Sequence, residues 1–525
     1  MAKINRPLVQ GLVCFGILAL WYAFFLVHTI DLTQGDLGRH LKNGQVIVEA
    51  VAGGDFTTLE KILHTNFYSA AFPEFPFINH HWSAGVVWHG VSLLFGLEGL
   101  TLFFTLLSVV AFGFFFSLAT KRAGLSIAFA VSFFLIPLVA ERSEIRPEVF
   151  SYLFAGLFFW ILNSYRAGKF SGLALVGLPF VQALWINLHI YFVLGPALIG
   201  IFWLRELGLR TRDWRRLKCL TIVGLVSVLA LLINPSGLRG ALYPFAIFQN
   251  FGLTIRENLS IAALSALRPG YINFLIFKIA VVLLILVFGW IFFKRRSDWS
   301  WFDALLIGFL ALWARGAARN LTLFALFAIP IGAGAIAAVR DSMPERIRLK
   351  LFRFHLVVLG AVMLGTLAMA GSWLKAIAPK FGLGLSPRQT AAGFLRESGF
   401  KGALFNDFDS GGQVIFELYP AVRPFVDNRP EAYPAEWFKS TYLPLVEDEP
   451  TWLAKSSTYG WSAIIYSFSN ASHSTIPFIL RRLQDPAWAP VFADRYSIAF
   501  LRRTKKNEAL IKRFELPKDM FQVVK

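Results

Sequence analysis

The chain has 525 residues, of which 56% are hydrophobic and only 16% are charged, and its mean hydropathy is +0.57. This composition excludes a soluble globular protein, and the repeated apolar runs of about twenty residues are typical of a polytopic α-helical membrane protein. The formal net charge is +19, but lysine and arginine fall mainly in short loops between the apolar runs. That distribution indicates membrane topology, and no nucleic-acid partner is expected.

The apolar runs predict about eleven membrane spans. They lie at residues 8–29, 99–120, 124–140, 148–165, 172–189, 190–205, 217–233, 271–293, 302–318, 320–339 and 353–375. A shorter apolar piece, residues 83–97, is expected to be re-entrant or interfacial. With that choice the inner loops hold roughly twice as many basic residues as the outer segments, which places the N-terminus inside.

A loop over residues 30–98, on the outer face, follows the first span and is longer than a connector needs. It carries Asp31, Asp36 and His40 near its start and the pair His80–His81 later. A carboxylate at a membrane surface can act as general base on an acceptor hydroxyl or amide. Asp36 and His40 are four residues apart, so a helix would place them on one face as candidate catalytic residues. The alternative is a solvated loop whose charges keep it out of lipid.

Cations on the same predicted face are candidates for binding a phosphate group. They are Arg146, Arg315 and Arg319, and the last two are expected to share a helical face because they are four residues apart. The alternative for these arginines is snorkelling toward lipid headgroups. Glu148 flanks Arg146, so it is a candidate for the same site, or a local ion-pair partner.

Further polar candidates for substrate contact are Asn187 and His189, for which hydrogen bonding between helices is an equal alternative. His80 and His81 suggest a metal site, but adjacent histidines point in different directions and no further ligand set is evident. No cofactor is therefore expected, and a divalent metal is the less favoured alternative. The sequence contains no GxGxxG or Walker pattern that would indicate a bound nucleotide.

After about residue 376 the hydropathy falls, which predicts a membrane domain over 1–375 and a soluble α/β domain over 376–525. Patterning in this tail predicts helices at 386–398 and 476–483 and strands at 402–408, 413–419, 424–427, 462–466 and 497–502. The tail is expected outside the membrane.

Several motifs together resemble those of bacterial membrane glycosyltransferases of the GT-C superfamily, relatives of the protein mannosyltransferases and the aminoarabinose transferase. The motifs are Asp36-Leu-Gly-Arg-His40, Asn79-His-His-Trp82, Arg146-Pro-Glu148, Trp185-Ile-Asn-Leu-His189, Asn234-Pro-Ser-Gly237, Arg315…Arg319-Asn320, Phe405-Asn-Asp407…Gly411-Gly412 and Phe425-Val-Asp-Asn-Arg429. The resemblance implies a GT-C fold in a bacterial inner membrane, with Asp36 as the acid of the first outer loop. It also implies a polyprenyl-phosphate-linked sugar as donor and an inverting transfer on the extracytoplasmic side.

Two other classes of function remain open from the sequence. One is a non-catalytic translocator or channel for a lipid-linked or anionic solute, and the other is a membrane scaffold whose tail binds a partner. A transporter needs polar groups at mid-membrane depth, and the predicted spans are nearly free of them, which favours chemistry at the surface. The expected partners are membrane lipids, the lipid-linked sugar and an acceptor glycan, lipid or protein.

Overall fold

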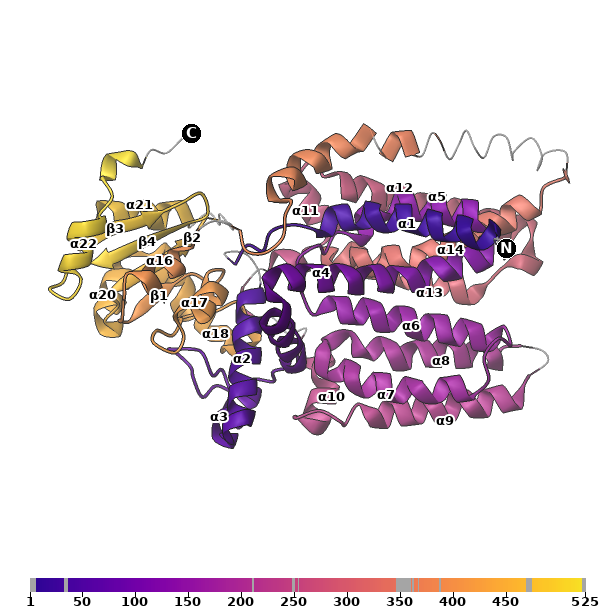
Figure 1. Ribbon diagram of the computed structural model, residues 1–525, viewed down its shortest axis with the longest axis horizontal. Helices are drawn as coiled ribbons and strands as arrows, with labels where there is room; N and C mark the ends of the chain where they lie inside the picture. The colour runs from indigo at the N-terminus through magenta and orange to yellow at the C-terminus, as the bar shows by residue number, and fades with distance from the viewer. Residues whose placement is uncertain are drawn as a thin grey trace, which may run out of the picture. The chain divides into compact units, whose positions relative to one another are not determined.

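The apolar runs of the sequence form long helices in the computed structural model of the chain (Figure 1). The structure describes residues 6–32, 36–209, 212–247, 251–253, 255–345, 360, 363–366, 368–386, 389–468 and 475–521. The chain forms two compact units. The helical unit consists of Met1–Thr29, Gly99–Ile233 and Ile255–Leu383, and the mixed unit consists of Ile30–Glu98, Asn234–Thr254 and Gly384–Lys525.

The helical unit is built from helices that run largely side by side (Figure 1). They are α1 (Arg6–Leu26), the later part of α4 (Trp82–Ala123), α5 (Leu125–Val139), α6 (Glu148–Arg166), α7 (Leu173–Leu188), η1 (Ile190–Val193), α8 (Leu194–Leu207), α9 (Trp214–Ala230), α11 (Ile261–Leu267), α12 (Ile272–Lys294), α13 (Trp301–Gly316), η4 (Ala318–Asn320) and α14 (Leu321–Asp341). Among the described residues, five helical segments are long and apolar enough to cross a membrane. The chain is a multi-pass membrane protein.

The centre of the helical unit is α14, which packs against α5, α12 and α13. Nearly every side chain from Leu321 to Ala333 is buried, as expected for a helix that is apolar on all sides. By contrast, α12 leaves Ile285 and Leu286 more than 60% exposed. Large apolar side chains exposed on a long helix are compatible with lipid contact.

Every predicted span from residue 8 to residue 339 coincides with a helix. The predicted span 353–375 lies in part outside the described residues. Within α4, Gly96 has φ 69° and ψ −177°, which breaks the helix between the piece predicted to be interfacial, 83–97, and the span at 99–120. The prediction that exactly these eleven segments cross the membrane stays a prediction.

The segment after α1, predicted to be the first outer loop, contributes helices to the mixed unit. It forms α2 (Leu37–Gly53), α3 (Phe56–His64) and the start of α4, and α10 (Gly237–Ala246) joins the same unit. The helices α2 and α4 approach closely at Gly44 and Gly85, because a Cβ atom on Gly44 would lie 2.0 Å from the carbonyl oxygen of Gly85. Two glycines thus let α2, which begins after Asp36, pack directly on the backbone of α4.

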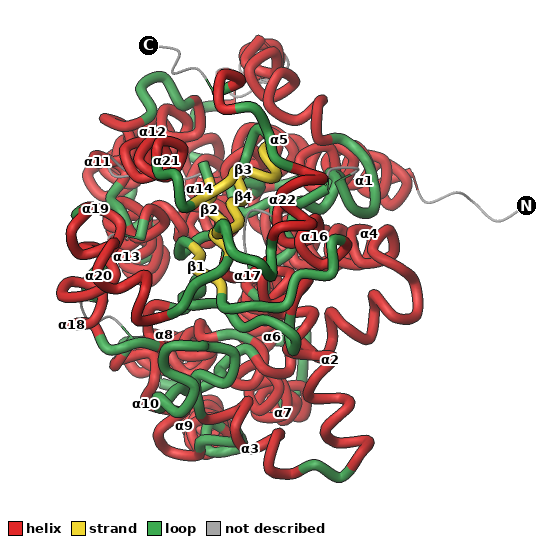
Figure 2. The backbone as a smooth tube through the Cα atoms, turned by 90° about the vertical axis from the view of Figure 1, so that its left-hand side faces the viewer, coloured by secondary structure: helices red, strands yellow, loops and turns green. Residues whose placement is uncertain are grey.

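The tail forms a four-stranded sheet, with strand order β1-β2-β4-β3 (Figure 2). The strands are β1 (Leu404–Asn406), β2 (Ala463–Ser467), β3 (Trp488–Ala493) and β4 (Ser497–Arg502). β1 and β2 are parallel, whereas β4 is antiparallel to both β2 and β3. Side chains alternate between two cores: Ala463 and Ile465 face one, and Ile464 and Tyr466 face the other.

Helices cover both faces of this sheet. The helices of the tail are α16 (Ala391–Glu397), α17 (Gly411–Leu418), α18 (Ala435–Trp437), η7 (Phe438–Tyr442), α19 (Leu443–Glu447), α20 (Glu449–Tyr459), α21 (Thr475–Gln484) and α22 (Glu508–Phe514). α16, α17 and α22 supply the core on one face. The other core draws on η7, α20 and α21 and also on Phe77, which lies between α3 and α4.

Several predictions for the tail are confirmed and two are wrong. The strands predicted at 402–408, 462–466 and 497–502 and the helix at 476–483 are present, and the helix predicted at 386–398 is shorter, at Ala391–Glu397. Residues 413–419 form α17, because a short apolar run with both sides buried fits a helix as well as a strand. Residues 424–427 form no strand, since the side chain of Asn406 bonds their backbone at Phe425 and Val426 in place of a ladder.

Replacing Gly44 by alanine should destabilise the chain. The new methyl group would meet the backbone of α4, and overpacking of this kind typically costs about 1–3 kcal/mol. The melting temperature of the purified full-length protein in detergent measures the effect. Gly53→Ala on the same helix is the matched control, because nothing lies within 4 Å of the position that its methyl group would take and alanine is the better helix former. Equal melting temperatures for the two variants would contradict the close packing of α2 on α4.

Candidate functional site

Asp36 stands at the N-cap of α2 in the mixed unit, and its carboxylate contacts Asn428 and Arg39. Oδ1 accepts a hydrogen bond from Nδ2 of Asn428 and lies 3.4 Å from Nη2 of Arg39. Nε of Arg39 in turn donates to Oδ1 of Asn428 at 3.3 Å. The three side chains close a triangle in which a carboxylate, a guanidinium and an amide each contact the other two.

The segment that carries Asn428 is fixed by its two neighbours in the sequence. Asp427 and Arg429 are 0% and 4% exposed and form a bidentate pair, with Nε and Nη2 of Arg429 each 2.7 Å from a carboxylate oxygen. Tyr433 also donates to Asp427 at 3.1 Å. Burial alone would raise the pKa of Asp427, but the charge of Arg429 holds it below its usual value. Asp427 is therefore ionised, and its ion pair with Arg429 holds this segment in place.

Arg429 also joins the tail to the segment between α3 and α4. Its Nη2 donates to Oδ1 of Asn66 at 2.7 Å, and Nδ2 of Asn66 donates to the carbonyl of Ala432 at 2.8 Å. The guanidinium carbon lies 4.8 Å from the ring centroid of Phe77 and 5.7 Å from that of Tyr68. Stacking and charge-assisted hydrogen bonds of this kind orient a buried guanidinium strongly.

The predicted histidines gather in the same unit as Asp36. The ring centroids of His40 and His81 are 5.6 Å apart, and those of His80 and His81 are 3.9 Å apart. Tyr243 of α10 continues the row, 5.1 Å from His80. The amide N–H of His40 donates to the carbonyl of Asp36 at 3.0 Å, which confirms the expected helical spacing of these two residues.

This histidine group does not form an evident metal site. Within the described ranges, no three His, Cys, Asp or Glu side chains converge as ligands. The contacts of the group include ring-to-ring contacts and a contact of 3.1 Å between Nδ1 of His80 and the carbonyl of Ile78. A divalent metal stays the less favoured alternative that the sequence predicted.

Other predicted site residues lie in the helical unit, around Arg142. Its Nη2 contacts Glu148 at 2.6 Å and Glu257 at 3.0 Å, and Arg146 contacts Glu144 at 2.9 Å and Glu257 at 2.8 Å. Burial raises the pKa of Glu257, but the two arginines outweigh it and lower the pKa to about 2. The local pairing expected for Glu148 is real, but its partner is Arg142 and not Arg146.

The aromatic and polar motif before η1 makes a hydrogen-bonded cluster. Trp185 donates to Oγ of Ser151 at 2.7 Å, and that oxygen lies 2.7 Å from Nδ1 of His189. Asn187 donates to the carbonyl of Ile233 at 2.7 Å, outside this cluster. His189 is only 4% exposed, and its described contacts join helices. For these residues the geometry fits the packing alternative, and contact with substrate stays a prediction.

Arg315 and Arg319 do not share a helical face, and this expectation was wrong. α13 ends at Gly316, and Ala317 is extended with φ −147° and ψ 116°, so Arg319 lies in the separate turn η4. The break arises because the backbone turns there into α14. Across the residues that the structure covers, neither arginine has a carboxylate within 4 Å, unlike Arg142 and Arg146. Arg319 lies within electrostatic range of His189.

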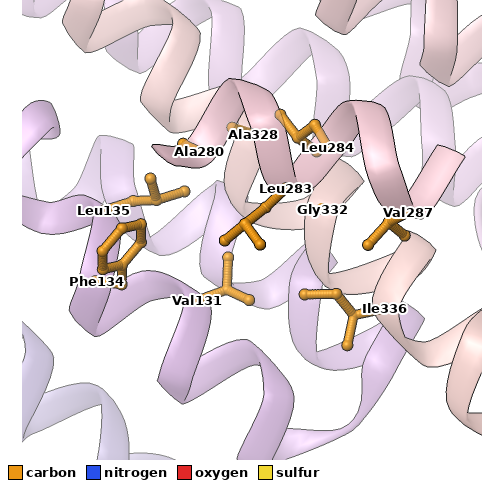
Figure 3. Close-up of a pocket in the computed structure, with 10 residues that line it drawn as sticks. All are labelled: Val131, Phe134, Leu135, Ala280, Leu283, Leu284, Val287, Ala328, Gly332 and Ile336. Atoms are coloured by element: carbon orange, nitrogen blue, oxygen red, sulfur yellow. The ribbon is translucent and has the colours of Figure 1, made fainter. Parts of the chain in front are cut away.

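The helical unit also contains a small pocket of about 80 Å³ between α5, α12 and α14 (Figure 3). All of its lining side chains are apolar, including Phe134, Leu283 and Ile336. Without a charged or hydrogen-bonding group, this pocket offers no acid, base or phosphate ligand.

The sequence prediction missed the role of Asn428 and the central place of Arg142. Asn428 belongs to a motif already noted, at 425–429, but nothing in its spacing links it to Asp36 across 392 positions. Glu431 was missed as well: it lies within electrostatic range of Arg39 and Arg429, and burial raises its pKa. The available signals were the motif at 425–429 for Asn428 and the charged segment 141–148 for Arg142.

Neither a protein-family model nor a curated relative matches the sequence. Solved structures do match it. They include the oligosaccharyltransferase AglB from Archaeoglobus fulgidus in complex with an inhibitory peptide and a dolichol-phosphate, with TM-score 0.56, 13% identity and coverage of 95% of this chain and 74% of that one. ArnT from Cupriavidus metallidurans in the apo state gives TM-score 0.50, 14% identity and coverage of 94% and 98%.

ArnT bound to undecaprenyl phosphate gives TM-score 0.46, 14% identity and coverage of 93% and 97%. AglB and ArnT are both members of the GT-C superfamily. The resemblance predicted from the sequence motifs is therefore confirmed for the fold.

A second buried carboxylate of the mixed unit, Asp407, follows β1. Its Oδ1 accepts from the backbone N–H of Ser467 at 3.0 Å. Burial and the negative charge of Asp409 raise the pKa of Asp407 to about 7. Between its ordinary value of 3.8 and about 7, the folded chain therefore binds a proton that the unfolded chain has released.

Asp407 should make the chain less stable as pH rises through this window, with a level contribution above about pH 7. Asp407→Asn keeps the acceptor for Ser467 but cannot ionise. The melting temperature of the wild type minus that of the variant, measured from pH 4 to pH 9, should fall with rising pH and then stay constant. A difference that does not change with pH would show that Asp407 has an ordinary pKa, and one that rises would show a lowered pKa; either result would contradict the prediction.

Proposed function

We propose that the chain is an inverting membrane glycosyltransferase, which moves a sugar from a polyprenyl-phosphate-linked donor to an acceptor on the extracytoplasmic face. The observation that carries the proposal is the Asp36 carboxylate, oriented by Arg39 and Asn428 in a unit that also holds His40 and His81. A carboxylate held in one orientation is what a general base requires.

The proposed reaction is a single displacement. The carboxylate of Asp36 takes the proton from the acceptor hydroxyl or amide while the acceptor oxygen or nitrogen forms a bond to the anomeric carbon. The bond between that carbon and the phosphate oxygen breaks, and its electron pair leaves with the polyprenyl phosphate. His40 and the His80–His81 pair shape the site, and aromatic rings of this kind suit the faces of a sugar.

The leaving phosphate gains negative charge, which a nearby cation stabilises. Arg315 and Arg319 are the better candidates for this role, because within the described structure their guanidinium groups are not held by carboxylates. Arg146 is also a candidate, but a phosphate would compete there with Glu144 and Glu257. No metal is included in the proposal.

The fold likeness supports this class of reaction. The fold that this chain shares with AglB extends over 95% of this chain. The structure of AglB contains a dolichol-phosphate, which is a polyprenyl-type lipid phosphate. We place the chain in a bacterial inner membrane with the N-terminus inside and the tail outside, where the tail helps to receive an acceptor glycan, lipid or protein.

A translocator of lipid-linked sugar is the second candidate, since it would use the same outer cations. The specific feature in its favour is the apolar pocket between α5, α12 and α14, whose lining suits a lipid chain (Figure 3). A transfer assay separates the two. If the wild type transfers no sugar but moves lipid-linked sugar across a vesicle membrane, the translocator takes the place of the transferase.

Asp36→Asn should lower turnover by roughly two to four orders of magnitude, the range typical for loss of a general base. The new amide keeps an oxygen that accepts from Asn428, so the protein should still fold and insert. Release of polyprenyl phosphate from a polyprenyl-phosphate sugar, in the presence of acceptor, measures the rate. Asp31→Asn is the control from the same loop and should transfer at the wild-type rate. Loss of transfer in Asp31→Asn, with a normal rate in Asp36→Asn, would show that the base is wrongly assigned.

A further inference from the structure

We infer that Asn428, contributed by the tail, is a positioning residue for the Asp36 carboxylate. The inference rests on the proposed function and adds to it a specific task for the tail. Asn428 touches neither sugar nor phosphate in this account. It acts through Asp36, whose Oδ1 it holds by a hydrogen bond.

An amide is the side chain that fits this place. Its Nδ2 donates to the Asp36 carboxylate while its Oδ1 accepts from Nε of Arg39 at 3.3 Å. A carboxylate at position 428 would accept from Arg39 but repel Asp36, and an apolar side chain would bind neither. Because Arg39 also lies 3.4 Å from Oδ1 of Asp36, two donors meet at the same oxygen and restrict the rotation of the carboxylate.

The backbone at position 428 is rigid enough for this task. Its neighbours Asp427 and Arg429 are buried and paired with each other at 2.7 Å. Gly411, at the start of α17, lies so close that a Cβ atom there would be 2.3 Å from Cα of Asp427. The segment is thus held by an ion pair on one side and by helix backbone on another. A side chain carried on such a segment can orient a partner with little loss of conformational entropy.

This arrangement explains why a base in the first loop depends on a segment 392 positions later. Asp36 stands just before α2, at a helix end, where side chains are less constrained than within a helix. Asn66 fastens the same loop to Arg429 at 2.7 Å. The tail therefore sets the orientation of the carboxylate, beyond any contact that it makes with an acceptor.

A double-mutant cycle on the full-length protein tests the inference. Asn428→Ala should lower kcat about 10- to 100-fold and leave KM for the polyprenyl-phosphate sugar unchanged, because a misplaced base slows the chemical step and not donor binding. In the Asp36→Asn background, the same substitution should cause no further loss. Losses that multiply in the double variant would overturn the inference, since a merely structural role would act independently of Asp36.

Two further variants keep the test decisive. Asn428→Asp is nearly isosteric, so it should fold, and it should lower kcat at least as much as Asn428→Ala because it places a carboxylate against Asp36. Asn507→Ala is the matched control: it removes a buried amide of the same unit that donates to Ser462 and Arg502 carbonyls at 2.9 Å, and it should keep the wild-type kcat. A wild-type rate in Asn428→Asp would overturn the inference. A wild type that transfers no sugar overturns the proposed function, and this inference with it.

Discussion

The buried guanidinium of Arg429 is the group around which the polar part of the mixed unit is arranged. A charge taken out of water is stable only where opposite charge and hydrogen-bond acceptors surround it. Asp427 supplies the charge, Asn66 supplies an acceptor from the segment between α3 and α4, and the rings of Phe77 and Tyr68 lie 4.8 and 5.7 Å from the guanidinium carbon. Removing either Asp427 or Arg429 would leave the other charge buried and unpaired, so the two residues stabilise the network only together. The position of Asn428, and through it that of the Asp36 carboxylate, follows from this constraint.

The helical unit meets the same physical requirement at Arg142, with a different result. Two carboxylates, Glu148 and Glu257, neutralise this buried cation, and Glu257 also pairs with Arg146. Charges placed in such a closed network stabilise the ends of helices but have little capacity left for a ligand. Arg315 and Arg319 lie outside this network, so they are the preferred candidates for binding the phosphate.

The sequence was sufficient for the features that depend on local pattern. The apolar runs predicted helices that the structure contains from residue 8 to residue 339, and the spacing of Asp36 and His40 predicted one turn of α2. The sequence was not sufficient where tertiary contacts determine the secondary structure or bring distant residues together. Residues 413–419 form a helix because both sides of the run are buried, and Asn428 meets Asp36 only in the folded chain. The turn between Arg315 and Arg319 depends on the extended backbone of Ala317. No residue type in this segment predicts such a break in the helix.

In the proposed reaction, Asp36 removes a proton and does not itself attack the sugar. The anomeric configuration of the transferred sugar, compared with that of the donor by NMR, tests this claim most directly. A single displacement assisted by a general base predicts inversion. Retention would contradict the account, because it requires two successive displacements through a glycosyl intermediate.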